Sequence, residues 1–247
     1  MITREDAEKK VALINNKLKN EDYEEALILL ESIPSEVLEN YDKTKLDIIE
    51  KLFYKLSNNK KFDEAIRKID AYKRKYYYFS TDLQKIETQI YFYLAEKEND
   101  EKKVDSALSY SEKSVSLDKN NENAKFLIIR ILIFDKKFYD KALEKISDLE
   151  ACVSNEKKNI LKNLKAAALN NKSNNLALTD LEGSLNLINK AIEIEPTEKL
   201  EMLKKNRLER FKKVFVQKIL DKKLEEIPKL FEKGNKYKFK SKEMENI

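Results

Sequence analysis

The sequence predicts an all-α fold, and three observations carry that prediction. Glycine and proline are rare, at two and three in 247 residues, whereas tight β-hairpins and glycine-rich α/β connections need more of both. Lysine, glutamate, leucine and alanine are abundant, and they lose little conformational freedom in a helix. A short pattern of an apolar, two polar and one small residue also recurs. We therefore expect an α-solenoid of about five antiparallel helix pairs with a C-terminal capping helix.

The recurring pattern marks the turn and the second helix of each expected pair. Its small residue lets two antiparallel helices approach closely, and the residue before it closes the turn. Successive small residues lie 39, 42, 35 and 42 positions apart, and the fourth occurrence carries one extra residue. The occurrences are Tyr23–Ala26, Phe62–Ala65, Val104–Ala107, Phe138–Ala142 and Leu181–Ser184.

Apolar residues at helical spacing, separated by polar turns, place the helices. Pro34 ends the first pair, because proline cannot continue a helix. A polar run, Asn170–Asn175, predicts a loop inside the fifth pair. The expected first helices are 4–19, 42–57, 81–99, 121–136 and 156–170. Their partners are 22–32, 61–75, 103–117, 139–152 and 177–194.

A long amphipathic helix near 198–224 follows the last pair. We interpret it as a cap that covers the last repeat; the alternative is a basic helix lying on a membrane surface. Residues 1–226 would form the repeat domain including the cap, and 227–247 a short turn and a basic, flexible tail. The basic face of the helix comprises Lys204, Lys205, Arg207, Arg210, Lys212 and Lys213.

The repeats resemble the tetratricopeptide repeat, a helix–turn–helix unit of 34 residues. Tyr91–Asn121 matches the family pattern at the large, leucine and small positions of the first helix and at Ala107 of the second. Leu185–Thr197 matches at its alanine and at the closing Pro196. The sequence departs from the family where Lys119 replaces the usual proline and where two repeats span 42 residues.

This resemblance implies a protein–protein interaction module, in which the first helices line a groove that holds a peptide or a helix of another protein. Arg130 is notable, because a lone charge in an apolar stretch should reach water, a carboxylate or a ligand. The alternative for Arg130 is a snorkelling side chain or an internal ion pair, and for Phe92 and Phe126 it is ordinary inter-repeat packing. The family's groove positions fall on Gln89, Phe92, Glu96, Asn123, Phe126, Arg130 and Ile133.

The competing hypothesis is a helical array that binds nucleic acid. The net charge is +5, and Lys73–Phe79 and Lys233–Lys242 both mix basic and aromatic residues, as single-strand binding surfaces do. The alternatives are packing between repeats for the first segment and a solvated chain end for the second. Steep loss of affinity with salt would favour nucleic acid.

Several functional classes are excluded. The chain has no histidine and a single cysteine, Cys152, so histidine-dependent triads, cysteine zinc sites and internal disulfides cannot form. Two distant glycines cannot build a phosphate-binding loop. We expect no enzyme activity, cofactor or metal, although carboxylate chemistry stays formally open. The first residues of the chain are followed directly by acidic ones, which is not the pattern of a secretory signal peptide. The longest apolar stretch, Phe126–Phe134, is far shorter than the ~20 residues of a membrane span. We expect a cytoplasmic protein.

Overall fold

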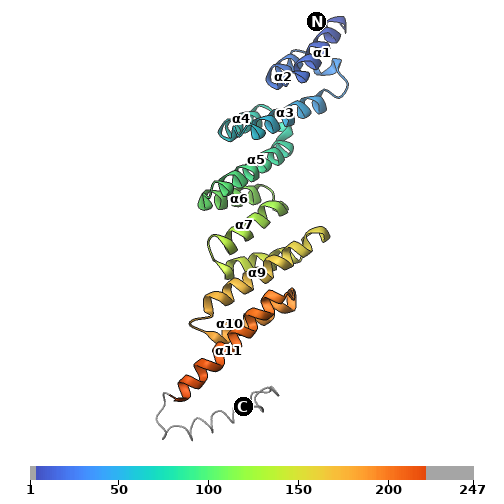
Figure 1. The fold of residues 1–247 in the computed structure, drawn as a ribbon. Helices are drawn as coiled ribbons and strands as arrows, with labels where there is room; N and C mark the ends of the chain where they lie inside the picture. The colour runs from blue at the N-terminus through green and yellow to red at the C-terminus, as the bar shows by residue number, and fades with distance from the viewer. Residues whose placement is uncertain (1–3, 221–247) are drawn as a thin grey trace. The chain divides into compact units, whose positions relative to one another are not determined.

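The structure is a computed structural model that describes the backbone of residues 4–220 and the side chains of residues 5–214. Over these residues it is all helical, with eleven α-helices and three short 3₁₀ turns (Figure 1). The predicted all-α fold is therefore confirmed. The predicted end of the last helix at 224 and the predicted tail at 227–247 lie outside the described residues, and the assignment of 1–226 as one domain stays a prediction.

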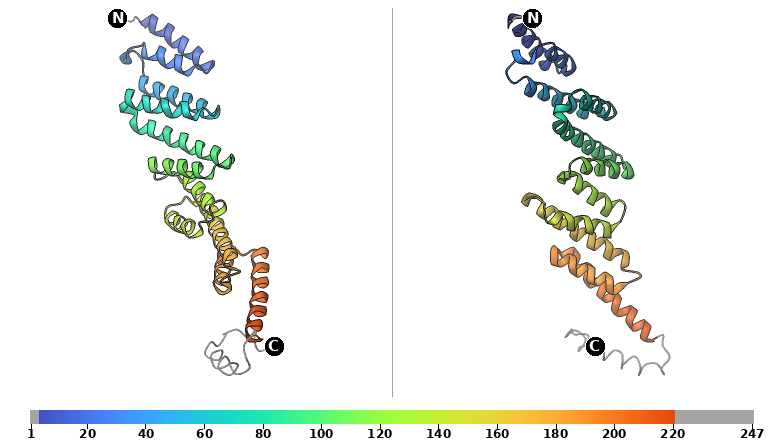
Figure 2. Two further views of the ribbon diagram at one scale, coloured as in Figure 1. Left: turned by 90° about the vertical axis from the view of Figure 1, so that its left-hand side faces the viewer. Right: turned by 180° about the vertical axis from the view of Figure 1, so that it is seen from behind.

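The helices fall into two compact units, of which the first ends at Lys136 and the second begins at Lys137. In the first unit, α1–α2, α3–α4 and α5–α6 pack as successive antiparallel pairs (Figure 2). In the second unit, α9 and α10 form a pair against which α8 and α11 pack. The first unit contains α1 (Arg4–Lys19), α2 (Tyr23–Glu31), α3 (Tyr41–Asn58), α4 (Phe62–Lys75), α5 (Ser80–Asp100), α6 (Val104–Leu117) and α7 (Glu122–Phe134). The second contains α8 (Tyr139–Glu150), α9 (Lys158–Leu176), α10 (Leu181–Ile194) and α11 (Glu198–Leu220).

The recurring small residue is fully buried in every repeat, with an exposed fraction of 0% at all five positions. In the pairs α1–α2, α3–α4, α5–α6 and α9–α10 a larger side chain there would hold the paired helices apart, so the pattern reports a real packing constraint. The five residues are Ala26, Ala65, Ala107, Ala142 and Ser184.

One detail of the pattern is wrong. We expected Phe138 to close the fourth turn, with one extra residue before Ala142. Instead Tyr139 begins α8 and is buried, whereas Phe138 is 53% exposed. With Tyr139 in that place, every second helix begins with an apolar or aromatic residue, and its small residue follows three positions later. The fourth repeat is therefore regular at this turn.

The turns inside the first three pairs share a backbone geometry that the sequence did not indicate. Glu21, Lys60 and Lys102 each have a φ between 57° and 62°, a left-handed conformation that glycine usually supplies. The next backbone N–H donates to a carbonyl five residues earlier, as in the bond of 2.8 Å from Lys103 to Glu98. This bond defines the Schellman motif that ends a helix.

The predicted loop at Asn170–Asn175 is also wrong, because α9 continues to Leu176. Three polar side chains of this stretch bind neighbouring helices: Lys172 binds Asp140 of α8, Ser173 binds Ser184 of α10, and Asn174 binds Arg207 of α11. Ser173 and Ser184 each donate a hydroxyl hydrogen bond to the other's backbone carbonyl, at 2.5 and 2.8 Å. Such internal partners remove the cost of burying polar groups in a helix.

Apolar cores hold the pairs together. One cluster runs from α1 to α5 and includes the fully buried Ile49 and Ile69, each of which stabilises the fold by about 1.5–3 kcal/mol. A second cluster joins α5, α6 and α7 around Ala95 and Ala107. A third joins α9, α10 and α11 around Ile188.

Candidate partner-binding surface

The helices α3, α5 and α7 each expose three side chains at the same spacing of seven and then four residues. Residues at this spacing lie on one face of a helix. Because α3 contacts α5 and α5 contacts α7, the three faces are neighbours. We call them, together with Tyr93 of α5, the first-helix surface. Its members are Asp47, Tyr54 and Asn58 of α3, Gln89, Tyr93, Glu96 and Asp100 of α5, and Asn123, Arg130 and Phe134 of α7.

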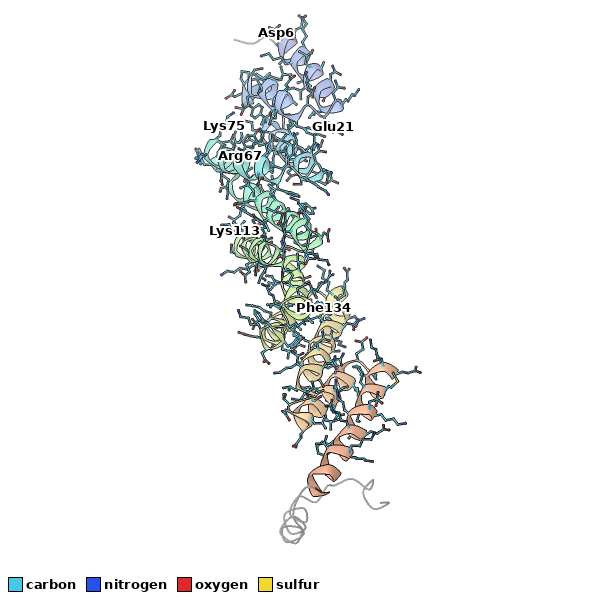
Figure 3. The ribbon with its side chains drawn as sticks, turned by 60° about the vertical axis from the view of Figure 1, so that its left-hand side comes forward. Asp6, Glu21, Arg67, Lys75, Lys113 and Phe134 are labelled. Carbon is cyan, nitrogen blue, oxygen red and sulfur yellow. The ribbon has the colours of Figure 1, made fainter. Side chains whose placement is uncertain are left out.

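Each of the three helices contributes one exposed aromatic ring to this surface. Tyr54, Tyr93 and Phe134 are 63%, 39% and 53% exposed, and Phe134 is labelled at the end of α7 in Figure 3. Single exposed apolar residues are normal on a protein surface. Aromatic rings on three adjacent helices are typical of a surface that binds another protein.

A pocket of about 280 Å³ lies within this surface, between the end of α3 and the second half of α5. Asn58 contributes to it from α3, and Tyr93, Glu96 and Asp100 contribute from α5. Its volume is close to the lower limit of about 300 Å³ for small-molecule sites. The pocket is therefore large enough for a side chain rather than for a cofactor.

The charges on the surface act on one another. Partial burial and the charge of Asp100 raise the pKa of Glu96, while Arg130 acts in the opposite direction. Arg130 is exposed, so it reaches water, as expected for a lone charge in an apolar stretch. Its effect on Glu96 shows that side chains of α5 and α7 share one electrostatic environment.

The predicted groove residues divide into two groups. Gln89, Glu96, Asn123 and Arg130 are exposed and belong to the first-helix surface. The three apolar residues are buried instead: Phe92 and Phe126 are 8% exposed and Ile133 is 1% exposed. The burial agrees with the alternative of packing between helices for the two phenylalanines, and Phe92 lies in the core cluster of Ala95 and Ala107.

Sequence reasoning missed the aromatic members Tyr54, Tyr93 and Phe134. The groove positions implied by the resemblance lie in the third and fourth repeats only, so they do not include Tyr54 of the second repeat. Tyr93 and Phe134 each lie one position beyond a buried groove residue, next to Phe92 and Ile133. Aromatic residues adjacent to the buried stripe of a first helix were the available signal.

The basic and aromatic segment Lys73–Phe79 is largely occupied inside the protein. Lys73 pairs with the buried Glu87, and Lys75, labelled in Figure 3, pairs with Glu31 at 2.7 Å. Tyr76 and Phe79 are buried, whereas Tyr77 and Tyr78 are exposed. Two of the three cations are thus neutralised, which weakens the hypothesis that this segment binds nucleic acid.

The basic face expected on the last helix needs a correction. Arg207, expected on the exposed basic face, is only 7% exposed, whereas the neighbouring Leu208 is 36% exposed. The guanidinium group of Arg207 donates hydrogen bonds to Ser173 and Asn174 of α9, so the helix is rotated relative to our expectation. Burial lowers the pKa of Arg207. The surrounding Lys205 and Arg210 remain exposed.

No helix within the described residues is long and apolar enough to cross a membrane. In the same part of the chain, no three cysteine, aspartate or glutamate side chains are grouped so that they would hold a metal ion. Cys152 is exposed and lies two residues after the end of α8.

The fold and the surface define an all-helical protein of repeated helix pairs that exposes aromatic and charged side chains along its first helices. No protein-family model matches the chain, and no curated protein is similar to it. Among solved structures, the chain is similar to the crystal structure of YrrB, described as "a TPR protein with an unusual peptide-binding site". The two are 16% identical, with a TM-score of 0.38, over 80% of this chain and 90% of YrrB.

Proposed function

We propose that this protein is a scaffold or adaptor that binds a peptide or helix of another protein across its first-helix surface. The observation that supports the proposal is the convergence of α3 and α5 on one pocket, beside three exposed aromatic rings. Exposed aromatic residues are frequent energetic centres of protein interfaces. A reducing cytoplasm is the compartment we propose, because the exposed Cys152 has no second cysteine with which to pair.

The mode of binding follows from the repeated spacing. Successive first helices offer equivalent positions, so an extended segment that crosses them meets one set of side chains from each helix. Tyr54, Tyr93 and Phe134 would supply apolar contact area. Gln89, Asn123 and Arg130 would orient the bound segment through hydrogen bonds and charge.

Affinity capture from the protein's own cells tests this function. The bait would be the full chain, compared with the double variant Tyr54→Ser and Phe134→Ser at low and high salt after nuclease treatment. A control variant, Ile28→Ser and Leu178→Ser, removes two residues that are 66% and 76% exposed outside the surface. We expect a protein partner that survives high salt, is lost with the surface variant and is kept with the control.

Two results would contradict the proposal. Equal capture of the partner by all three baits would show that the first-helix surface takes no part in binding it. Recovery of nucleic acid alone, lost at high salt or after nuclease, would support the competing hypothesis.

A further inference from the structure

The pocket on the first-helix surface contains a polar group that lacks an internal partner. Ser57 of α3 lines the pocket and is only 8% exposed. Among the described residues, no group forms a hydrogen bond with its hydroxyl. Its hydroxyl reaches the solvent of the pocket, and a serine hydroxyl accepts hydrogen bonds from an incoming donor. Ser57 therefore offers a hydrogen-bond acceptor to a group that enters the pocket.

Two carboxylates on the pocket wall have no cation within ion-pair distance among the described residues, although Arg130 of α7 acts on one of them, Glu96. Glu96 and Asp100 lie four residues apart on α5, and within the described residues neither forms an ion pair. Partial burial and the charge of Asp100 raise the pKa of Glu96, so this site disfavours a second negative charge. A cation placed between the carboxylates would relieve their repulsion.

The remaining charges of the pocket are largely compensated within the protein. The Nζ atom of Lys97 lies 3.6 Å from a carboxylate oxygen of Glu98 and 3.8 Å from one of Glu101. The carboxylate of Glu101 also pairs with Nζ of Lys103 at 2.7 Å. Lys60 is an exposed lining residue, so the lining holds two ammonium groups, of Lys60 and Lys97, against three carboxylates, of Glu96, Asp100 and Glu101. The pocket therefore keeps a net negative charge that is available to a ligand.

An aromatic ring completes the pocket. Tyr93 is 39% exposed and lies one helical turn before Glu96 and Lys97. The face of an aromatic ring attracts ammonium and guanidinium groups. The hydroxyl of Ser57, the two carboxylates and the ring of Tyr93 together match a long side chain with a cationic end. The pocket volume of about 280 Å³ suits a single side chain.

We propose that this pocket binds a lysine or arginine side chain of an extended, basic peptide segment. The inference rests on the proposed function and names the chemistry of its partner. The cation would lie between Glu96 and Asp100 and donate a hydrogen bond to Ser57, while its aliphatic stem packs against Tyr93. The bound segment is basic even though the protein itself has a net charge of +5.

Fluorescence anisotropy with three labelled nine-residue peptides tests the inference. The peptides alternate alanine with arginine, glutamine or glutamate, and the protein is the full chain. The test variant is Glu96→Gln with Asp100→Asn. The control is Glu144→Gln with Asp148→Asn, an exposed pair on α8 with the same spacing and the same change of charge.

We expect the arginine peptide to bind most tightly, the test variant to weaken it roughly tenfold, and the control to leave it unchanged. Ser57→Ala should weaken binding by a smaller factor in the same direction. Equal losses in the test and control variants, or no loss in either, would overturn the inference, because they indicate unspecific attraction.

The two proposals fail in distinguishable ways. Binding of the glutamine or glutamate peptide that the Tyr54→Ser and Phe134→Ser variant abolishes would keep the proposed function and overturn the choice of a basic partner. Absence of binding by all three peptides would also overturn the basic pocket. The capture experiment would then decide the proposed function separately.

Discussion

The guanidinium group of Arg207 on α11 donates a hydrogen bond to the hydroxyl of Ser173 on α9. Ser173 is fully buried and in turn exchanges hydrogen bonds with Ser184 of α10. These contacts link three helices of the second unit through neutral oxygen acceptors. Within the described residues, Arg207 has no carboxylate partner. The position of α11 therefore depends on hydrogen bonds as well as on apolar packing.

Replacing Arg207 with alanine should destabilise the second unit. The substitution removes this donor from the buried hydroxyl of Ser173 and from Asn174, and it removes the packed stem, so we expect a loss of about 1–3 kcal/mol in the free energy of unfolding. Arg210→Ala on the same helix is the control, because Arg210 is exposed; it should change stability by less than about 0.5 kcal/mol. Urea unfolding of both variants measures the difference, and equal stabilities would mean that the buried hydrogen bonds contribute nothing.

Replacing Ala107 with leucine should overpack the contact between α5 and α6. Ala107 is fully buried in the core cluster of those helices, so we expect a cost of roughly 1–3 kcal/mol. Ala12→Leu on the exposed face of α1 adds the same atoms without crowding. An unchanged unfolding midpoint for Ala107→Leu would contradict the register of the third repeat.

Replacing Lys102 with glycine should stabilise the protein. Lys102 is exposed and has a φ of 62°. This conformation costs a residue with a side chain about 1–2 kcal/mol, whereas glycine adopts it freely but loses about 0.5–1 kcal/mol through its greater freedom in the unfolded chain. We expect a net gain of roughly 0.5–1 kcal/mol. Lys102→Ala keeps the strain and is the control; a gain of the same size there would exclude the backbone explanation.

The pH dependence of stability should contain a contribution from Glu31. Burial acts to raise the pKa of Glu31, but hydrogen bonds from Lys75 and Tyr76 outweigh it, so the pKa is lowered from 4.5. A carboxyl group with a lowered folded pKa contributes stability above its unfolded pKa and loses it as the pH falls through the folded value.

Thermal unfolding between pH 7 and pH 3 measures this contribution. We expect the stability of the wild type to fall more steeply below about pH 4.5 than that of Glu31→Gln. Glu36→Gln, at an exposed position nearby in the sequence, is the control and should follow the wild type. Parallel curves of thermal stability against pH for the wild type and Glu31→Gln would show that these hydrogen bonds make no pH-dependent contribution to the stability of the folded state.

The helices and the pairs α1–α2, α3–α4, α5–α6 and α9–α10 were predictable because two local signals recur. Polar turns separate amphipathic stretches, and a small residue such as Ala65 marks each close helix contact. The turns themselves were less predictable, since Lys60 and Lys102 adopt a conformation that glycine normally signals. The number of residues between repeats gave no warning that Tyr139, and not Phe138, begins α8.

Burial of polar residues limited the rest of the prediction. The sequence predicts a loop at Ser173 and Asn174 and a surface position for Arg207. In the structure, Arg207 of α11 donates hydrogen bonds to Ser173 and Asn174 of α9. Single-helix patterns do not contain such tertiary partners. The same limit applies to the candidate site: the pattern indicates a first-helix face, but only packing decides that Phe92 is buried and Tyr93 exposed.

Site-specific photo-crosslinking in the protein's own cells tests most directly whether the first-helix surface binds a partner protein. A photoreactive phenylalanine derivative would replace Tyr93 in one variant and Ile28, which is 66% exposed on the second helix α2, in another. We expect a discrete cross-linked protein from position 93 and none from position 28. The same partner at both positions, or none at position 93, would contradict a binding role for this surface.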